Sequence, residues 1–335
     1  MTKSPNPKIL IRTPNWLGDL VISTGFISAV LENFPNSEID LIVRSGFENL
    51  PLIHRGKILI FDPKKNSSGD FGKKLIKNNY DIFFVLPPSF SSAWMAFKSK
   101  ASKRIGYKGQ FRSILLNYSK SYEKKPRTEH ILKEYMNLLS PNLSIEKYPP
   151  YLKTSRKWIE SNLNSLEYPL PQSFFAISPG AVYGRTKQWP TIYFRKLVKK
   201  LNKFTESQTI ILGTFDDIKL GEEISNGLES VQNFCGKTSL SQLIAVLSKA
   251  KLLIGNDSGS MHLMSALKRP QIAIFGSTSP KWTSPINPNS TIIKEDLKCS
   301  PCFSRTCRYN HYECLTKITP EIVFQKIQKI ITKLN

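Results

Sequence analysis

Residues 252–262 have the sequence Leu-Leu-Ile-Gly-Asn-Asp-Ser-Gly-Ser-Met-His, and this stretch decides the fold class. The apolar run at 252–254 predicts a buried strand, and the apolar spacing over 262–267 predicts a helix directly after it. The same succession of a short apolar strand and an amphipathic helix recurs along the chain on both sides of this stretch. Strands that alternate with helices through short connections indicate parallel α/β units.

The alternation falls into two halves, separated by residues 147–171, whose prolines interrupt both helices and strand ladders. We place an inter-domain linker there and predict two doubly wound α/β domains, residues 1–160 and 171–319, that face each other across a cleft. A final helix over 320–335 is left to pack on either domain, including back on the N-terminal one. The predicted strands are 9–11, 39–43, 58–61, 82–86, 174–178, 209–212, 252–254 and 272–275, and further helices are predicted over 22–34, 193–202 and 240–249.

The composition limits the class of protein. With 40% hydrophobic residues among 335, the chain has enough apolar surface to bury real cores, which excludes a wholly disordered protein. Lys and Arg number 48 against 25 Asp and Glu, a formal charge of +23, which favours a polyanionic partner. No stretch approaches the ~20 apolar residues that span a bilayer. The apolar run Ile9-Leu10-Ile11 is also shorter than the ~7–15 residues of a signal-peptide core, so we expect a cytoplasmic protein.

The positive charge is concentrated between residues 98 and 127. Three interpretations remain open for this segment: a solvated face, a docking surface for an anionic acceptor or membrane, and a nucleic-acid-binding surface. Its aromatic residues match no RNA-recognition motif, and no helix-turn-helix or zinc-finger spacing is present. The segment holds one acid, Glu123, and ten basic residues: Lys98, Lys100, Lys103, Arg104, Lys108, Arg112, Lys120, Lys124, Lys125 and Arg127.

Two loops in equivalent places of the two halves carry candidate catalytic residues. Arg12-Thr-Pro-Asn-Trp-Leu-Gly-Asp19 follows the first strand, where Asp19 is either a helix N-cap or a general base. Ser178-Pro-Gly-Ala-Val-Tyr-Gly-Arg-Thr-Lys-Gln-Trp-Pro190 follows the first strand of the second half. There Lys187 or Arg185 either neutralises a diphosphate or belongs to an ordinary surface loop.

Two further turns in the second half are candidates for binding a nucleotide. Free backbone N–H groups at the helix start after Asp257, with Ser258 and Gly259, form an anion site together with the helix dipole. His262 lies one turn further on and is either a ligand of the same anion or a core histidine. Asp217, after the strand at 209–212, resembles the acid that binds ribose hydroxyls, although a loop acid is more often only solvated.

Taken together and in this order, the motifs resemble the ADP-heptose:lipopolysaccharide heptosyltransferases of glycosyltransferase family 9, and within them the inner-core heptosyltransferase II type. The similarity covers nearly the whole chain. The matching stretches are Thr13-Pro-Asn-Trp-Leu-Gly-Asp19, Arg104-Ile-Gly-Tyr107, Ser178-Pro-Gly-Ala181, Lys187-Gln-Trp-Pro190, Asn256-Asp-Ser-Gly-Ser-Met-His262, Ala273-Ile-Phe-Gly-Ser-Thr278 and Ile318-Thr-Pro-Glu321.

The resemblance implies a GT-B fold, with two Rossmann-like domains of which the N-terminal one receives the acceptor and the C-terminal one binds the ADP-sugar. It places the catalytic base on Asp19, the phosphate-binding lysine on Lys187, and the nucleotide-binding turn on Asp257, Ser258, Gly259 and His262. Relatives usually have Glu where this chain has Asp217, so the side chain that would contact the ribose is shorter here. Arg104 and Arg112 are the candidates for acceptor contact.

The implied reaction is inverting transfer of heptose from ADP-L-glycero-D-manno-heptose to a Kdo–lipid A core that bears heptose, at the cytoplasmic face of the inner membrane. Positive charge from Lys187 and a helix N-terminus would replace a metal, so we expect no catalytic cofactor. A family-9 enzyme with another donor or acceptor is the first alternative. A non-catalytic basic protein that binds nucleic acid is the alternative from another class.

Four cysteines, Cys299, Cys302, Cys307 and Cys314, crowd near the C-terminus with the spacing C-x2-C-x4-C-x6-C. Three interpretations stay open: a structural zinc site, in which His311 can replace one ligand, reduced thiols in a loop, and disulfides. The implied transfer reaction gives this cluster no role. Cys235 stands apart and is expected to be a small buried hydrophobe.

Overall fold

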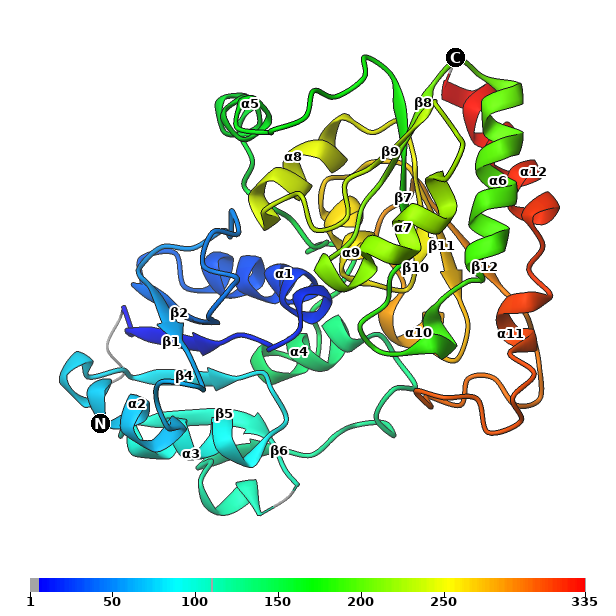
Figure 1. The fold of residues 1–335 in the computed structure, drawn as a ribbon. Coiled ribbons are helices and arrows are strands. Elements are labelled where there is room, and N and C mark those ends of the chain that lie inside the picture. The colour runs from blue at the N-terminus through cyan, green and yellow to red at the C-terminus, as the bar shows by residue number, and fades with distance from the viewer. Residues whose placement is uncertain (1–5, 110, 335) are drawn as a thin grey trace. The chain divides into compact units, whose positions relative to one another are not determined.

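The computed structural model describes residues 6–109 and 111–334, and the chain divides into two compact units between Lys153 and Thr154 (Figure 1). The division falls inside the proline-rich stretch 147–171. Residues 154–160, which the sequence analysis assigns to the first domain, belong to the second unit because α5 (Arg156–Asn164) packs on α8 (Leu240–Lys249).

The first unit is built on a parallel sheet of six strands, counted over its described residues. Its two central strands are buried along their whole length, in keeping with the apolar runs Ile9-Leu10-Ile11 and Ile82-Phe83-Phe84-Val85. The strands are β1 (Ile9–Arg12), β2 (Ile39–Arg44), β3 (Ile58–Phe61), β4 (Ile82–Val85), β5 (Lys103–Tyr107) and β6 (Tyr118–Lys120). The helices are α1 (Leu17–Asn33), α2 (Ser68–Lys74), α3 (Phe90–Lys98) and α4 (Ile131–Leu139), with 3-10 turns η1 (Ile76–Asn78) and η2 (Arg112–Ile114).

The second unit repeats this architecture with its own parallel sheet of six strands among the described residues. The strands are β7 (Phe174–Ser178), β8 (Gln208–Ile211), β9 (Val231–Asn233), β10 (Leu253–Asn256), β11 (Gln271–Phe275) and β12 (Ser290–Lys294). Besides α5 and α8, the helices are α6 (Thr191–Phe204), α7 (Ile218–Ser225), α9 (Gly259–Ala266), α10 (Pro280–Thr283), α11 (Glu313–Thr316) and α12 (Pro320–Leu334), with 3-10 turns η3 (Arg185–Lys187) and η4 (Phe215–Asp217).

Both sheets have the same strand order. It is β3-β2-β1-β4-β5-β6 in the first unit and β9-β8-β7-β10-β11-β12 in the second, the order of a dinucleotide-binding sheet. The order reverses between β1 and β4 and between β7 and β10, and ligands of such sheets bind at the carboxyl ends of the strands beside this reversal. The loops after β1, β7 and β10 are therefore the places to look for a site.

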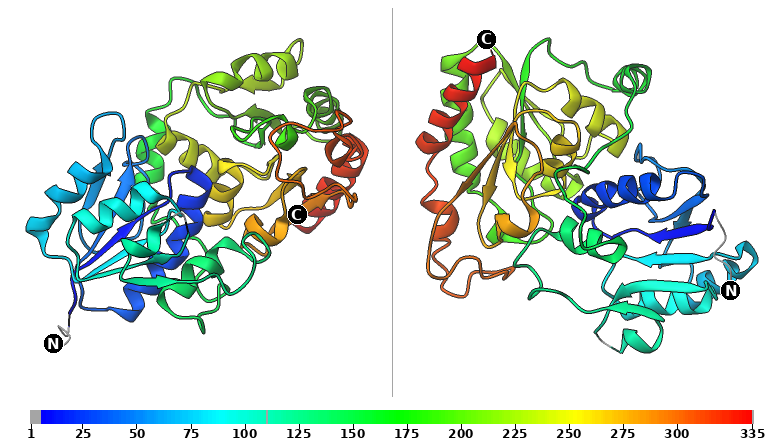
Figure 2. Two further views of the ribbon diagram at one scale, coloured as in Figure 1. Left: turned by 90° about the horizontal axis from the view of Figure 1, so that it is seen from below. Right: turned by 180° about the vertical axis from the view of Figure 1, so that it is seen from behind.

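Helices cover both faces of each sheet (Figure 2). In the first unit α1 packs with α4, and α2 packs with α3; in the second, α5, α8 and α9 form one group and α6, α7 and α12 the other. Gly25 lies in the middle of α1, where a Cβ atom would collide with the carbonyl of Tyr148 and with Leu132 of α4. The missing side chain is what lets the chain pass so close to this helix.

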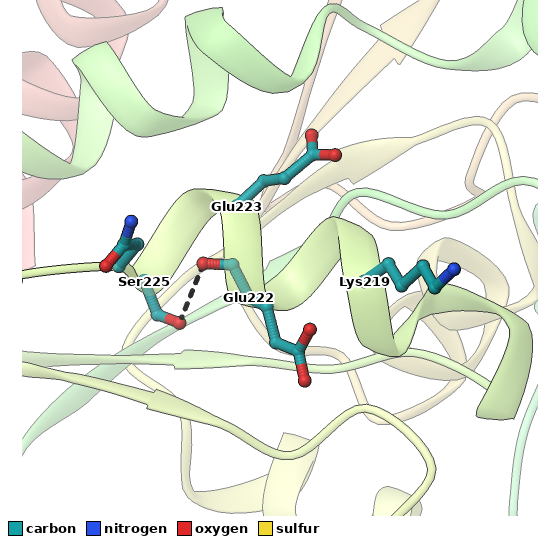
Figure 3. A pocket seen from close by; sticks show the side chains of 5 residues that line it. Lys219, Glu222, Glu223 and Ser225 are labelled. Carbon is teal, nitrogen blue, oxygen red and sulfur yellow. Dashed lines mark hydrogen bonds between the residues drawn. The ribbon is translucent and has the colours of Figure 1, made fainter.

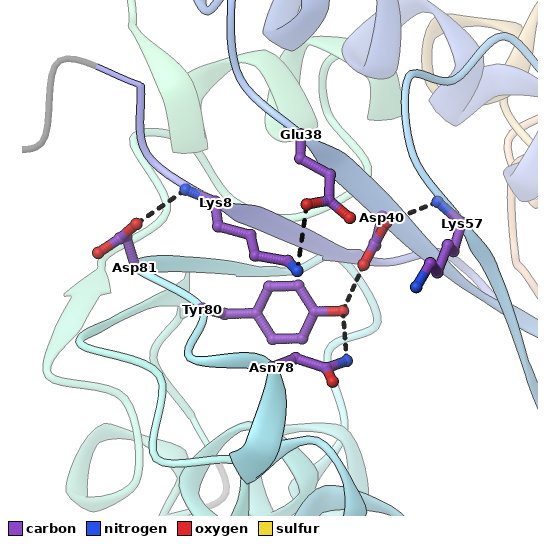
Figure 4. Close-up of polar contacts among 7 residues, drawn as sticks. All are labelled: Lys8, Glu38, Asp40, Lys57, Asn78, Tyr80 and Asp81. Atoms are coloured by element: carbon purple, nitrogen blue, oxygen red, sulfur yellow. Dashed lines mark hydrogen bonds and ion pairs between the residues drawn. The ribbon is translucent and has the colours of Figure 1, made fainter.

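A polar network ties down the amino ends of β1, β2 and β4 (Figure 4). The carboxylate of Asp40, only 1% exposed, accepts hydrogen bonds from the Tyr80 hydroxyl and from the Lys57 backbone N–H. Burial, and then the bond to Asp40, raises the pKa of Tyr80. The backbone N–H of Lys8 donates to Asp81 at 2.8 Å. Because these groups satisfy one another's hydrogen bonds, the amino ends of the strands serve the fold, and a functional site is expected at the carboxyl ends.

The final helix α12 packs on the second unit. Its Val323 and Ile327 are fully buried in that unit's core, and Lys200 of α6 pairs with Glu321 at 3.2 Å. The expectation that this helix packs back on the N-terminal domain is wrong, because its apolar stripe is already covered by α6. No helix among the described residues is long and apolar enough to cross a membrane.

Candidate functional site

The loops after β7, β10 and β11 bring Lys187 and Asp257 together in the second unit. The Lys187 ammonium lies 2.6 Å from Oδ2 of Asp257, and the side chains are 14% and 3% exposed. The hydroxyl of Thr278 donates to the same oxygen at 2.6 Å. The loop lysine is therefore held at the carboxyl edge of the sheet, where the prediction places it, and it is not an ordinary surface lysine.

Asn256, the last residue of β10, joins this arrangement to the neighbouring loop. Its side-chain oxygen accepts the backbone N–H of Trp189 at 3.0 Å, and its side-chain nitrogen donates to the carbonyl of Pro179 at 2.7 Å. Both Asn256 and Trp189 are buried. A buried amide that satisfies two backbone groups fixes the ends of the loop that carries Lys187. The sequence analysis quotes Asn256 within its motif but assigns it no role.

Helix α9 begins directly after Asp257. Its N-cap is Ser258, which makes no side-chain capping bond, and the Ser258 hydroxyl oxygen is buried without a hydrogen-bond partner among the described residues. Backbone N–H groups at such a helix start attract an anion, as does the helix dipole. His262 lies one turn further along and is 5% exposed. This burial is compatible with both predicted roles, a ligand of the anion and a core histidine.

Asp217 closes the turn after β8. Its Oδ2 accepts hydrogen bonds from the Thr214 backbone N–H and hydroxyl, both at 2.8 Å, in a capping box. A Cβ atom on Gly180 would collide with the same carboxyl group, so Asp217 packs against the loop after β7. The structure thus brings Asp217 next to the start of the Lys187 loop, with one carboxylate oxygen engaged in the turn.

The cysteine-bearing segment supports the Lys187 loop from outside, a contact that no sequence signal predicts. The Tyr183 hydroxyl donates to the carbonyl of Phe303, and the Thr186 hydroxyl donates to that of Ser304. The Tyr183 ring has the Lys187 ammonium 4.9 Å from its centre and the Arg305 guanidinium at 5.4 Å. The segment therefore positions the loop by its backbone and by the Tyr183 ring.

The thiols of this segment do not form the predicted zinc site. In the part of the chain that the structure describes, no three His, Cys, Asp or Glu side chains are arranged to hold a metal ion. All four thiols are free in this structure, which favours reduced thiols over disulfides. Burial first, and then the neighbouring thiols, raise the pKa of Cys314 to about 11. The clustered cysteines, all of them free, are Cys299, Cys302, Cys307 and Cys314. Cys235 is buried, as expected.

In the first unit, Asp19 lies in the first turn of α1, half-buried beside α4. The N-cap of α1 is Trp16, so the interpretation of Asp19 as the cap is wrong; the helix begins earlier than the predicted residue 22. Burial is the largest cause that raises the pKa of Glu134 on α4 to about 7, and the negative charges of Glu129 and Asp19 add to it. The structure therefore reveals a second carboxyl group within electrostatic reach of Asp19 that the sequence analysis missed.

Arg104 and Arg112 are engaged within the first unit itself. Arg104 donates to the carbonyls of Leu115 and Ala101, at 2.9 and 2.7 Å. Arg112 is 5% exposed and donates to the carbonyls of Gly109 and Lys108. Both guanidinium groups therefore hold their own turns of the first unit together.

A hollow over α7 is lined by residues other than these candidates (Figure 3). Its walls come from a single helix, and Ser225 donates within that helix to the carbonyls of Gly221 and Glu222. None of the candidate residues Lys187, Asp217 and Asp257 lines it. The residues that line it are Lys219, Glu222, Glu223, Ser225 and Asn226.

Residues 69–313 match the model of glycosyltransferase family 9 (heptosyltransferase), which covers most of the chain. The chain belongs to this family. It is 29% identical to lipooligosaccharide heptosyltransferase 2 of Haemophilus influenzae, over 97% of this chain and 99% of the relative. It is 26% identical to lipopolysaccharide heptosyltransferase 2 of Escherichia coli K12, over 97% and 98%.

A solved structure, that of E. coli ADP-heptose lipopolysaccharide heptosyltransferase II, shares the fold with a TM-score of 0.84. The two are 24% identical, and the match covers 97% of this chain and 99% of the other. The predicted family, the GT-B class of two doubly wound α/β domains and the glycosyltransferase activity are confirmed.

Proposed function

We propose that this family-9 glycosyltransferase moves L-glycero-D-manno-heptose from its ADP derivative to the inner core of lipopolysaccharide. The observation that carries the proposal is the Lys187–Asp257 pair at the start of α9, where a nucleotide diphosphate would bind. The names of its full-length relatives support heptose as the sugar and lipopolysaccharide or lipooligosaccharide as the product class.

Lys187 and the α9 N-terminus stabilise the negative charge that develops on the departing diphosphate. The ammonium is already oriented by Asp257 and by the Tyr183 ring, so it needs little reorganisation when the bond to the sugar breaks. The buried hydroxyl of Ser258 offers a further donor. Since fixed positive charge is supplied by these groups, the reaction proceeds without a catalytic metal.

Asp19 acts as the general base that removes the proton from the acceptor hydroxyl as it attacks the anomeric carbon. Such assistance contributes about 10²–10⁴-fold to the rate. Its neighbour Glu134, whose pKa is raised to about 7, is partly protonated at neutral pH. A protonated Glu134 carries no charge and therefore does not place a second negative charge beside Asp19.

In this proposal the first unit, which ends at Lys153, binds the acceptor, and the second unit, which begins at Thr154, binds the donor, with Asp217 in contact with the ribose. The partner that holds the lipid acceptor is the anionic cytoplasmic face of the inner membrane, to which the enzyme binds peripherally. The basic segment 98–127 supplies the charge for this contact. Each basic residue near such a surface contributes about 1 kcal/mol.

The proposal is tested by incubating the purified full chain with ADP-heptose and Kdo–lipid A that bears heptose, and measuring ADP release together with the mass of the acceptor. We expect ADP and acceptor gain in equal amounts, and no turnover by Asp19→Ala with unchanged thermal unfolding. Release of a different nucleotide from a panel of sugar donors would favour the family-9 alternative with another donor. Full activity of Asp19→Ala would remove the proposed base.

A further inference from the structure

Two large apolar side chains stand out from the first unit in the connection between β5 and β6. Phe111 is 79% exposed and Ile114 is 78% exposed, although Phe and Ile are among the residue types most often buried. We call this pair the apolar tip. Both side chains lie inside the basic segment 98–127.

The turn that carries the apolar tip is anchored from below. Leu115 and Leu116 follow directly and are buried in the core with Met95 of α3. Arg112 lies between the two exposed residues, is itself buried, and donates to the carbonyls of Gly109 and Lys108. Because these neighbours face the core, the turn directs Phe111 and Ile114 outward, and their exposure is a built feature of the fold.

An aromatic row on α3 lies beside the apolar tip. Phe90, Trp94 and Phe97 are spaced at i, i+4 and i+7 and stack, with ring centres 6.4 and 5.6 Å apart. Phe90 is 49% and Phe97 is 41% exposed. The Arg104 guanidinium connects the row with the tip, since it lies 5.8 Å from the Phe97 ring and donates to the carbonyl of Leu115.

Positive charge surrounds these apolar groups. Lys98 lies 4.4 Å from the centre of the Trp94 ring, and Lys103 lies 5.5 Å from that of exposed Tyr118. Lys100 and Lys108, in the same segment, are exposed. Long basic side chains that cover aromatic rings while keeping the charge in water are typical of a membrane interface.

We propose that the apolar tip, with the aromatic row, inserts into the headgroup region of an anionic bilayer while the basic residues around it contact lipid phosphates. A bilayer fits better than a folded protein partner because the apolar side chains protrude from the surface, and because exposed basic residues of the segment, among them Lys100, Lys108 and Lys125, match phosphate headgroups. The choice of a lipid surface rests on the proposed lipid-linked acceptor. It goes beyond that proposal by adding an apolar anchor to a contact assigned to charge alone.

The test is co-sedimentation of the full chain with vesicles of phosphatidylethanolamine and phosphatidylglycerol, with phosphatidylcholine vesicles as the neutral control. We expect binding to the anionic vesicles that weakens, but does not vanish, as salt rises. The variant Phe111→Ser/Ile114→Ser should bind about 100-fold more weakly, about tenfold for each apolar side chain withdrawn. Phe215→Ser, which changes a phenylalanine that is 78% exposed in the second unit, is the matched control and should bind like the wild type.

The outcomes are distinguishable. Equal binding by the wild type and the double serine variant would show that charge alone holds the protein and would overturn the proposal. No binding of the wild type to anionic vesicles would also overturn it and would leave the surface to a protein partner. Thermal unfolding of the double variant should match the wild type, because both side chains face solvent. Turnover on an acyl-free, water-soluble acceptor should also match; if the wild type lacked that turnover yet bound vesicles, only the proposed function would fail.

Discussion

Replacing Lys187 by methionine separates its structural role from its proposed chemical one. The substitution leaves the Asp257 carboxylate, 3% exposed, with Thr278 as its one remaining side-chain donor among the contacts described. Removing one partner of a buried ion pair costs about 3–5 kcal/mol. Because the Lys187 side chain is 14% exposed, we expect the lower end, a loss of about 3 kcal/mol in the free energy of unfolding.

The double variant Lys187→Met/Asp257→Asn decides between the two roles. The neutral amide oxygen of Asn still accepts the Thr278 hydroxyl and no longer buries a lone charge, so stability should return to within about 1 kcal/mol of the wild type. Turnover should stay low in both variants, by about 10²–10³-fold, because the charge that stabilises the departing diphosphate is gone. Urea unfolding followed by circular dichroism measures the first quantity, and release of ADP measures the second.

A matched control is Lys200→Met, in the same unit, where the pair with Glu321 has side chains 39% and 58% exposed. It should lose less than about 1 kcal/mol and keep its turnover. The reasoning is refuted if the double variant recovers turnover along with stability, since Lys187 would then serve only to neutralise Asp257.

Three further outcomes follow from the same geometry. Glu134→Gln should be more stable than the wild type by about 1–2 kcal/mol at pH 8, after allowance for solvent screening, because the fold raises the pKa of this carboxyl to about 7 and so disfavours its ionised form. This difference in stability should shrink as pH falls through 7, and unfolding at several pH values measures it. EDTA should leave ADP release within about twofold of the untreated rate, since fixed charges take the place of a metal; a loss restored by Mg²⁺ would contradict this. Tyr183→Phe should lose about 0.5–1.5 kcal/mol of stability with its bond to Phe303 and raise the KM for the donor, with kcat less affected.

Apolar runs predicted the central strands well and the edge strands poorly. The central strand over 174–178 and the helix over 240–249 were predicted with the bounds that the structure has, and so was one edge strand, 58–61, because it is an apolar run. The strands β5, β6, β9 and β12 were missed. They include sequences such as Tyr-Ser-Lys and Val-Gln-Asn, because a strand near the edge of a sheet keeps polar side chains and is exposed on one side. Pairing with a neighbour, which a local pattern does not contain, is what makes them strands.

The places of the candidate site residues in the fold could be predicted from the sequence, but their partners could not. Lys187, Asp257 and Asp19 follow strand-to-turn patterns, and such turns meet at the carboxyl edge of a parallel sheet. The pairing of Lys187 with Asp257 depends on β7 lying next to β10, which sequence order does not state. Glu134 carries no local signal at all, because its raised pKa comes from burial against other elements.

The cysteine segment shows why spacing alone misleads about a ligand set. Four thiols at short intervals resemble metal ligands, yet what the structure uses in this segment is the backbone carbonyls of Phe303 and Ser304, which hold Tyr183 and Thr186. A carbonyl contact places no demand on the side chain of the residue that makes it, so no motif records it. Because the same segment places Arg305 against the Tyr183 ring that faces Lys187, a change in its conformation would act on the proposed diphosphate site through that ring.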